Sequence, residues 1–171
     1  LSAALLAADE WRDLRVLIAP HDPSPPYVAR LQALLPAPSA LYSAGPAPAG
    51  TKAYVVDSVG LLNGLYRYAQ AAYIGGGFGR GIHNTLEPAA YGLPVLFGPR
   101  YHKFEEARQM LRRGGAFCVN NAAELAAALR DLRDSGRLKT ASEAVLGYLR
   151  ENQGATSAIM AYICRRDRHD T

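Results

Sequence analysis

Short runs of aliphatic residues alternate along the chain with longer segments in which apolar residues recur at helical spacing. This alternation is typical of a parallel sheet covered by helices. The pattern predicts strands at residues 15–19, 41–43, 53–56, 71–74, 95–97 and 116–119, the second of them the weakest. We therefore expect an α/β fold, with a Rossmann-like parallel sheet of about six strands flanked by helices.

Helices are expected between these strands and after the last of them. The predicted ranges are 27–35, 60–69, 86–91, 103–113, 122–132, 138–149 and 155–164. Apolar residues recur at Phe104, Ala107 and Leu111, and such a stripe buries one face of a helix against a sheet. Gly114 and Gly136 are the expected C-terminal stops of the two helices that precede them.

The composition is that of one globular domain spanning residues 1–171. Hydrophobic residues make up 49% and charged residues 20%, which excludes a disordered tail or a fibrous repeat. No apolar run approaches the roughly 18 to 20 residues that a membrane-spanning helix needs. Residues 36–50, rich in Pro, Ala, Ser and Gly, are expected to form surface loops. Cys118 and Cys164 are expected to be reduced thiols in the core, not a disulfide or metal ligands.

The N-terminal residues and the net charge indicate what kind of chain this is and which partners it favours. Because the chain begins at Leu1 and residues 1–8 lack the basic start of a signal peptide, we expect a soluble fragment of a longer protein. The formal net charge of +4 favours anionic partners. Nucleic acid is not expected, since no basic stripe interleaved with aromatics is present. The basic run Arg165, Arg166 and Arg168 is either a solvated helix end or a phospholipid contact.

A glycine-rich segment follows the strand predicted at residues 71–74. Five glycines fall within the seven residues 75–81, where missing Cβ atoms permit positive φ and close approach of a ligand. The segment leads into a helix that must begin just before Pro88, because proline is tolerated only in the first turn. A strand, a glycine loop and a helix N-terminus form either a nucleotide-phosphate site or a purely structural turn.

The common phosphate-loop and catalytic motifs are absent. GxxxxGK[ST] fails because Ile82 follows Gly81, and GxGxxG fails because neither Gly75/Gly77 nor Gly77/Gly79 has a glycine three residues further on. No GxSxG or Cys/His signature marks a nucleophile, and the four histidines are not at metal-ligand spacing. We therefore expect a domain that holds a nucleotide leaving group, with no metal and no cofactor.

Several polar residues near this segment have both a structural and a ligand-binding interpretation. Glu87 either stabilises the helix dipole or accepts hydrogen bonds from sugar hydroxyls, and Asn84 is either a cap or a ligand contact. Arg80 and His83 lie on an exposed loop, which favours a ligand role. His21, after the strand at 15–19, is either a contact in the ligand crevice or a turn residue.

Four loops at strand ends are expected to converge on one edge of the sheet. They contain His21, residues 57–60, the glycine segment and residues 101–103. In open parallel sheets this edge carries the ligand crevice.

Residues 54–119 resemble the C-terminal half of 3-deoxy-D-manno-octulosonic acid (Kdo) transferases, which are GT-B-fold glycosyltransferases of lipopolysaccharide synthesis. The matching segments are Val55-Val56-Asp57-Ser58-Val59-Gly60, the glycine segment, His83-Asn84-Thr85-Leu86-Glu87-Pro88-Ala89, Gly92-Leu93-Pro94-Val95 and Gly98-Pro99. Ile18-Ala19-Pro20-His21 and Asn152-Gln153-Gly154-Ala155-Thr156 also resemble family segments. The chain departs from the common family pattern at Gly77, where Ser or Thr is usual, and in a shortened glycine loop.

The resemblance implies that this domain binds the donor CMP-Kdo and that Kdo passes with inversion to a lipid A precursor. The implied donor-binding residues are His21, Ser58, Gly60, Gly76, Gly77, Phe78, Gly79, Arg80, His83, Asn84 and Glu87. The resemblance also implies metal-independent transfer at the cytoplasmic face of the bacterial inner membrane. It places the catalytic base, a carboxylate, in an N-terminal half outside this chain. The helices at about 137–166 are expected to contact that half.

Two other functions fit the same residues. One is the C-terminal half of another GT-B enzyme that uses a UDP-sugar, and the other is a non-catalytic module that binds sugar phosphates. Nucleotide preference separates the first alternative from the Kdo transferase, and the presence of a catalytic N-terminal half separates the second.

Overall fold

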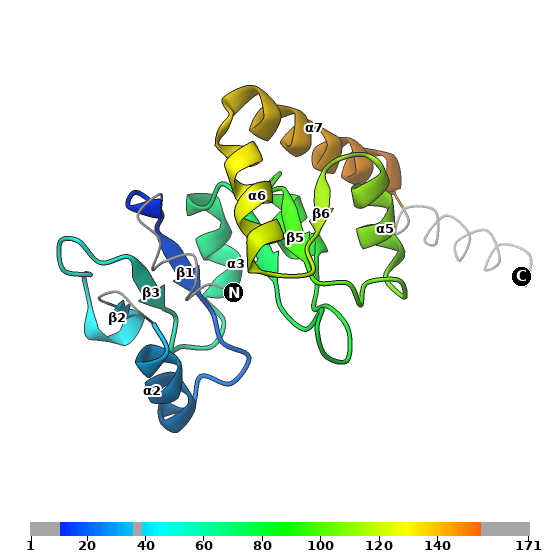
Figure 1. The fold of residues 1–171 in the computed structure, drawn as a ribbon. Coiled ribbons are helices and arrows are strands. Elements are labelled where there is room, and N and C mark those ends of the chain that lie inside the picture. The colour runs from blue at the N-terminus through cyan, green and yellow to red at the C-terminus, as the bar shows by residue number, and fades with distance from the viewer. Residues whose placement is uncertain (1–10, 36–38, 155–171) are drawn as a thin grey trace, which may run out of the picture.

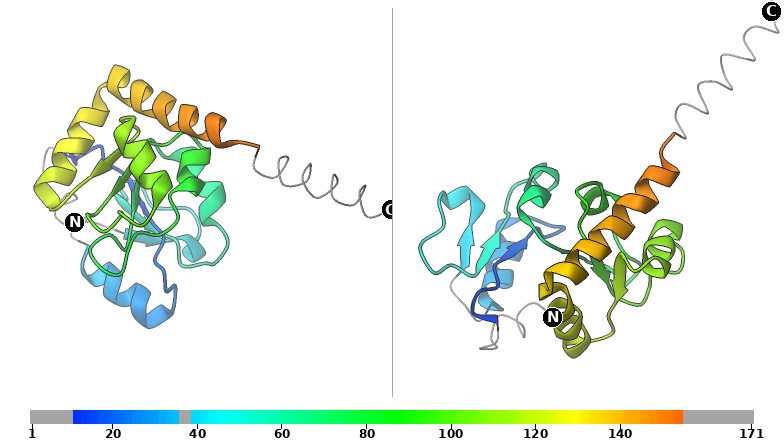
Figure 2. Two further views of the ribbon diagram at one scale, coloured as in Figure 1. Left: turned by 90° about the vertical axis from the view of Figure 1, so that its right-hand side faces the viewer. Right: turned by 90° about the horizontal axis from the view of Figure 1, so that it is seen from above.

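The computed structural model describes residues 11–35 and 39–154, which contain six short parallel strands (Figure 1). The strands are β1 (Val16–Ile18), β2 (Ser39–Leu41), β3 (Ala53–Val55), β4 (Ala72–Ile74), β5 (Val95–Phe97) and β6 (Ala116–Cys118). They pair in two three-stranded sheets with the orders β1-β3-β2 and β4-β5-β6. In the two registers Val16 pairs with Ala53, and Val95 pairs with Ala116. The two sheets form separate lobes (Figure 1 and the right-hand view of Figure 2).

The predicted α/β class, with parallel strands flanked by helices, is confirmed, but the single sheet of about six strands is wrong. Each sheet holds three strands, and β1 and β4 each form an edge of their own sheet. A short apolar run indicates that a strand is buried but does not specify which strand lies beside it. The edge positions show this, since Leu17 in β1 and Tyr73 in β4 are both exposed.

The strand predicted at residues 41–43 is also misplaced. β2 ends at Leu41, and Tyr42–Ala44 form a short 3-10 helix, η2. The backbone N–H of Ser43 donates to the Asp57 carboxylate (3.0 Å), so it is not available to a strand ladder. A side chain 14 positions away therefore ends this strand.

The helices lie close to their predicted places. They are α2 (Pro25–Ala33), α3 (Leu62–Leu65), η3 (Tyr66–Tyr68), α4 (Leu86–Ala90), α5 (Glu105–Arg112), α6 (Ala122–Arg133) and α7 (Ser135–Asn152). The helix predicted at 60–69 is a single turn followed by a 3-10 turn, consistent with the low helix propensity of Gly64 inside it. As predicted, α4 begins just before Pro88. The helix predicted at 155–164, together with Cys164 and the basic run at Arg165, lies outside the described residues.

Gly136 is not the stop that the sequence predicts. It lies in the first turn of α7, and Asp134 separates this helix from α6. The Asp134 side chain accepts a hydrogen bond from the backbone N–H of Arg137 (2.7 Å), which caps α7. Gly114, in contrast, follows α5 with a φ of +79°, as a helix stop requires.

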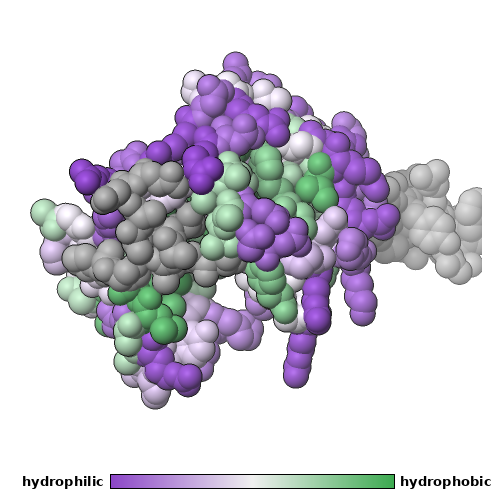
Figure 3. Space-filling view, in the orientation of Figure 1, coloured by the Kyte–Doolittle hydropathy of each residue, from purple (hydrophilic) through white to green (hydrophobic). Residues whose placement is uncertain are grey.

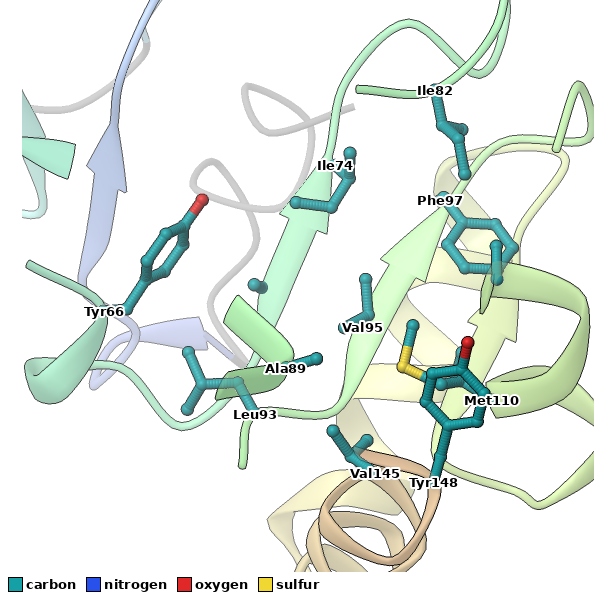
Figure 4. Packing of buried hydrophobic residues seen from close by; sticks show 13 residues of the cluster. Tyr66, Ile74, Ile82, Ala89, Leu93, Val95, Phe97, Met110, Val145 and Tyr148 are labelled. Carbon is teal, nitrogen blue, oxygen red and sulfur yellow. The ribbon is translucent and has the colours of Figure 1, made fainter. Parts of the chain in front are cut away.

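The second sheet is covered on both faces. Val95 and Phe97 of β5 contribute to a cluster with Met110 of α5 and Val145 of α7 (Figure 4). Leu96, which points to the opposite face, belongs to a second cluster with Leu125 and Leu132 of α6. α7 runs across this lobe (Figure 2). The packing of these two clusters fixes the position of the strand ends from which the site is built.

Trp11 joins the N-terminal part of the chain to the second lobe. Its side chain is 2% exposed and packs in the cluster that contains Leu96 and Val119. The Arg133 guanidinium of α6 lies over the indole ring, 4.5 Å from its centroid. Residues 11–15, which lead into β1, are therefore anchored on the other sheet.

Candidate functional site

The glycine loop, residues 75–81, follows β4 and folds back on itself. The carbonyl oxygen of Gly76 accepts hydrogen bonds from the N–H groups of Gly79 (2.8 Å) and Gly81 (3.3 Å). Gly76 has a φ of +87°, and a Cβ atom there would lie 2.2 Å from the Gly81 oxygen. The tight curl of the loop therefore requires glycine at position 76.

The loop between β5 and α5, residues 98–104, packs against the glycine loop. A Cβ atom on Gly77 would lie 2.5 Å from the Gly98 nitrogen, so the two backbones are in direct contact. The backbone N–H of Arg100 donates to the Gly77 oxygen (3.0 Å), and Arg100 Nη1 donates to the Gly79 oxygen (2.7 Å). Since β4 and β5 are adjacent and parallel, their C-terminal loops meet at one sheet edge, as predicted.

Asn84 and Glu87 form a local network at the start of α4. Asn84 Oδ1 accepts the N–H of Leu86 (2.9 Å), and Asn84 Nδ2 donates to Glu87 Oε1 (2.9 Å). The buried hydroxyl of Thr85 finds no hydrogen-bond partner in the described part of the chain. Asn84, rather than Thr85, thus provides the polar cap of this helix. Both Asn84 and Glu87 are exposed, so the network lies at the surface beside the glycine loop.

The Glu87 carboxylate also affects a buried aromatic residue. Burial, followed by the charge of Glu87, raises the pKa of Tyr66 above its ordinary value. Tyr66 packs beside Tyr91 with 5.9 Å between ring centroids. The phenol of Tyr66 is therefore protonated at neutral pH and can donate a hydrogen bond near this end of α4.

His21 and His83 meet across the two lobes. Their imidazole rings are stacked with 5.3 Å between centroids and 12° between planes. His21 follows β1 in the first sheet, and His83 follows the glycine loop in the second. The structure therefore brings together two predicted site residues that lie 62 positions apart.

Ser58 and Gly60 lie on the loop after β3, at the carboxyl edge of the first sheet. Their neighbour Asp57 faces η2, where its carboxylate accepts hydrogen bonds from both the N–H and the hydroxyl of Ser43. These hydrogen bonds, the hydroxyl first, lower the pKa of Asp57. Ser58 and Gly60 make no hydrogen bond to the glycine loop within the described residues. The predicted convergence of four loops is thus established by contacts for the loops after β1, β4 and β5 only.

The charges around the glycine loop favour an anion. Arg80, Arg100 and Lys103 are exposed on the glycine loop and on the loop after β5. Figure 3 shows long hydrophilic side chains projecting from this side of the second lobe, beside a hollow between the two lobes. Clustered cations at a concave surface raise the local concentration of an anionic ligand.

The described residues contain no group of three or more His, Cys, Asp and Glu side chains that could hold a metal ion. Within residues 11–35 and 39–154, every helix is too short or too polar to span a bilayer. Cys118 is a free, partly buried thiol, and burial raises its pKa. A thiol with a raised pKa is a weak nucleophile.

Sequence reasoning did not identify Arg100 as a site residue. The arginine directly follows Gly98-Pro99, but its side-chain bond to Gly79 spans 21 positions and leaves no local pattern. The pairing of Ser43 with Asp57 was missed for the same reason.

Comparison with known proteins gives sequence relatives and a structural neighbour. No protein-family model matches the chain. Three similar proteins are named 3-deoxy-D-manno-octulosonic acid transferase. The one from Aquifex aeolicus is 41% identical over 80 residues, which are 46% of this chain and 23% of that protein. The one from Rickettsia prowazekii is 32% identical over 104 residues, which are 58% of this chain and 23% of that protein. The one from Chlamydophila psittaci is 34% identical over 84 residues, which are 48% of this chain and 19% of that protein.

The structural neighbour is the crystal structure of the C-terminal CMP-Kdo binding domain of WaaA from Acinetobacter baumannii. It matches with a TM-score of 0.76 and 24% identity, over 87% of this chain and 80% of that chain. The chain therefore has the fold of this domain, and the resemblance to Kdo transferases indicated by the sequence motifs is confirmed. The matched region spans less than a quarter of each of the three relatives.

Proposed function

We propose that this chain is the donor-binding domain of a Kdo transferase and that it binds CMP-Kdo at the glycine loop. The observation that carries the proposal is the match of 87% of the chain to a CMP-Kdo binding domain. The three transferases named above support it from sequence, since they are 32–41% identical to segments of this chain. The glycine loop, at a sheet edge and beside exposed cations, supplies a site suited to the anionic donor.

The proposed contacts follow from the geometry of the loop. The donor phosphate is proposed to lie against Gly76, Gly77, Phe78, Gly79 and Arg80, and the amides of Phe78 and Arg80 donate to no backbone carbonyl of the described residues. His21 and His83 lie close enough to each other to face the same ligand from the two lobes.

The nucleoside is proposed to lie near α4. Asn84 holds Glu87 Oε1, so the carboxylate keeps a second oxygen that can accept hydrogen bonds from ribose hydroxyls. Ser58 and Gly60 are proposed to contact the donor from the loop after β3, at the carboxyl edge of the first sheet.

In the complete protein we propose that Kdo passes with inversion to a lipid A precursor at the cytoplasmic face of the inner membrane. The carboxylate base would come from the N-terminal half. The C-terminal segment from about residue 137, which begins in α7, would contact that half. This chain alone is therefore expected to bind the donor without turning it over.

Nucleotide preference tests the proposal. A ligand that binds only the folded state stabilises it by about 2.7 kcal/mol at one hundred times Kd. We expect CMP to raise the Tm of the chain in a thermal-shift experiment, with UDP and ADP producing smaller shifts at the same concentration. A larger shift with UDP would favour a UDP-sugar enzyme instead. No response, or an equal response to all three nucleotides, would contradict the proposal.

The DNA sequence upstream of Leu1 tests the alternative of a non-catalytic module that binds sugar phosphates. If the chain is such a module, translation of this DNA should give no α/β half with an acidic residue at its site. The proposed transferase predicts that such a half is encoded there.

Glu87→Ala is expected to weaken CMP binding about tenfold, which corresponds to about 1.4 kcal/mol. Because Glu87 is exposed, and a helix-end charge contributes at most about 1 kcal/mol, the Tm should change by only a few degrees. Titration calorimetry measures the affinity. Glu143→Ala removes an exposed carboxylate from α7 and serves as the matched control, with wild-type affinity expected. Unchanged CMP affinity in Glu87→Ala would leave Glu87 only its role at the helix end.

A further inference from the structure

Two carbonyl groups of the glycine loop are held by one residue of the neighbouring loop. Arg100 donates its backbone N–H to the Gly77 oxygen (3.0 Å) and its Nη1 to the Gly79 oxygen (2.7 Å). The bond to Gly79 is charge-assisted, which makes it stronger than a bond between neutral groups. Both carbonyl groups therefore point toward Arg100.

Because the peptide bond is planar, the direction of each C=O group fixes the direction of the N–H group that follows it. In a trans peptide the C=O and the following N–H point in opposite directions, and the described residues contain no cis peptide. The N–H groups of Phe78 and Arg80 are therefore directed away from Arg100. Both residues are exposed, and within the described part of the chain neither amide donates to a backbone carbonyl. Backbone N–H groups in a turn that have no carbonyl partner can form an anion-binding concavity.

We infer that Arg100 is a positioning residue that orients the amides of Phe78 and Arg80 toward the phosphate of a bound nucleotide. The inference rests on the proposed function. It assigns Arg100 a role in binding that does not require its guanidinium to touch the ligand.

The composition of the loop explains why such a residue is needed. Five glycines in seven residues give the free loop many accessible conformations, and each must be lost when a ligand binds. The bonds within the loop converge on Gly76, at its N-terminal end. The side chain of Arg100 instead holds Gly79, on the far side of Phe78. A loop fixed before binding costs less to order, so its affinity is higher.

The test compares three variants of the chain. Arg100→Met removes the side-chain bond but keeps the length of the side chain and the backbone N–H. Arg100→Lys keeps the charge and a donor. Arg112→Met removes an exposed arginine of α5 that is paired with Glu105 and has no bond to the glycine loop, so it is the matched control.

CMP affinity and amide NMR signals are measured for each variant. Arg100→Met is expected to bind CMP about tenfold more weakly, Arg100→Lys to recover most of this loss, and Arg112→Met to bind like the wild type. In the absence of nucleotide, the amide signals of Gly79 and Arg80 are expected to shift in Arg100→Met and to exchange faster with solvent. A residue that only contacts the ligand would leave these ligand-free signals unchanged.

The outcomes separate this inference from the proposed function. If the wild type does not bind CMP, the proposed function fails and the inference fails with it. If the wild type binds CMP, but Arg100→Met binds within twofold of it or keeps wild-type ligand-free amide signals, the inference alone is overturned.

Discussion

Gly77→Ala is expected to abolish measurable CMP binding and to lower the free energy of unfolding by about 1–3 kcal/mol. A Cβ atom at this position would lie 2.5 Å from the Gly98 nitrogen and 2.7 Å from its Cα. Backbone atoms of a buried strand end cannot move aside cheaply, so the two loops must separate. That separation would break the bonds from Arg100 that orient the glycine loop. Titration calorimetry and urea unfolding measure the two effects.

Gly64→Ala is the matched control. Gly64 lies in α3, and an added Cβ would meet no atom within 4 Å. Since alanine has a higher helix propensity, this variant should keep CMP affinity and be equally or slightly more stable. Wild-type affinity and stability in Gly77→Ala would show that the two loops are not in contact. In this structure a Ser or Thr side chain at position 77 would meet Gly98 in the same way.

Trp11→Ala is expected to lower the free energy of unfolding by about 3–5 kcal/mol. The indole is 2% exposed, packs against Leu96 and Val119, and lies beneath the Arg133 guanidinium. Its removal leaves a cavity on one face of the second sheet and releases the segment that leads into β1. Urea unfolding followed by circular dichroism measures the loss, because the variant has no tryptophan left for fluorescence.

Trp11→Phe fills part of the same space and should cost markedly less than Trp11→Ala. Arg133→Met tests the contribution of the guanidinium, which is expected to be about 0.5–1 kcal/mol because the arginine is partly exposed. A loss below about 1 kcal/mol in Trp11→Ala would contradict the anchoring of the N-terminal segment on the second lobe.

The fold could be predicted from the sequence where the information was local. The aliphatic runs located every strand except β2, and Pro88 located the start of α4. Strand pairing could not be predicted, because it depends on tertiary contacts between strands and helices that hydrophobic periodicity does not encode. Trp11 illustrates the limit, since it stands before the first strand of one sheet but packs in the core of the other.

The candidate site also contains some features that local sequence predicts and others that depend on tertiary contacts. The glycine segment and the His83–Glu87 motif are contiguous in the chain, so sequence alone could indicate them. The stacking of His21 on His83 and the bonds from Arg100 to the glycine loop require tertiary structure. Gly77 departs from the family pattern, and the sequence alone does not show what surrounds it. In the structure its backbone contacts Gly98 so closely that a side chain at position 77 does not fit.

The glycine loop is the proposed nucleotide-binding site, and amide NMR of the chain titrated with CMP measures binding there residue by residue. Saturable chemical-shift changes are expected that are largest at the amides of Phe78 and Arg80 and extend to Asn84 and Glu87. Saturable changes confined to residues outside the glycine loop and α4, or no changes at all, would contradict it.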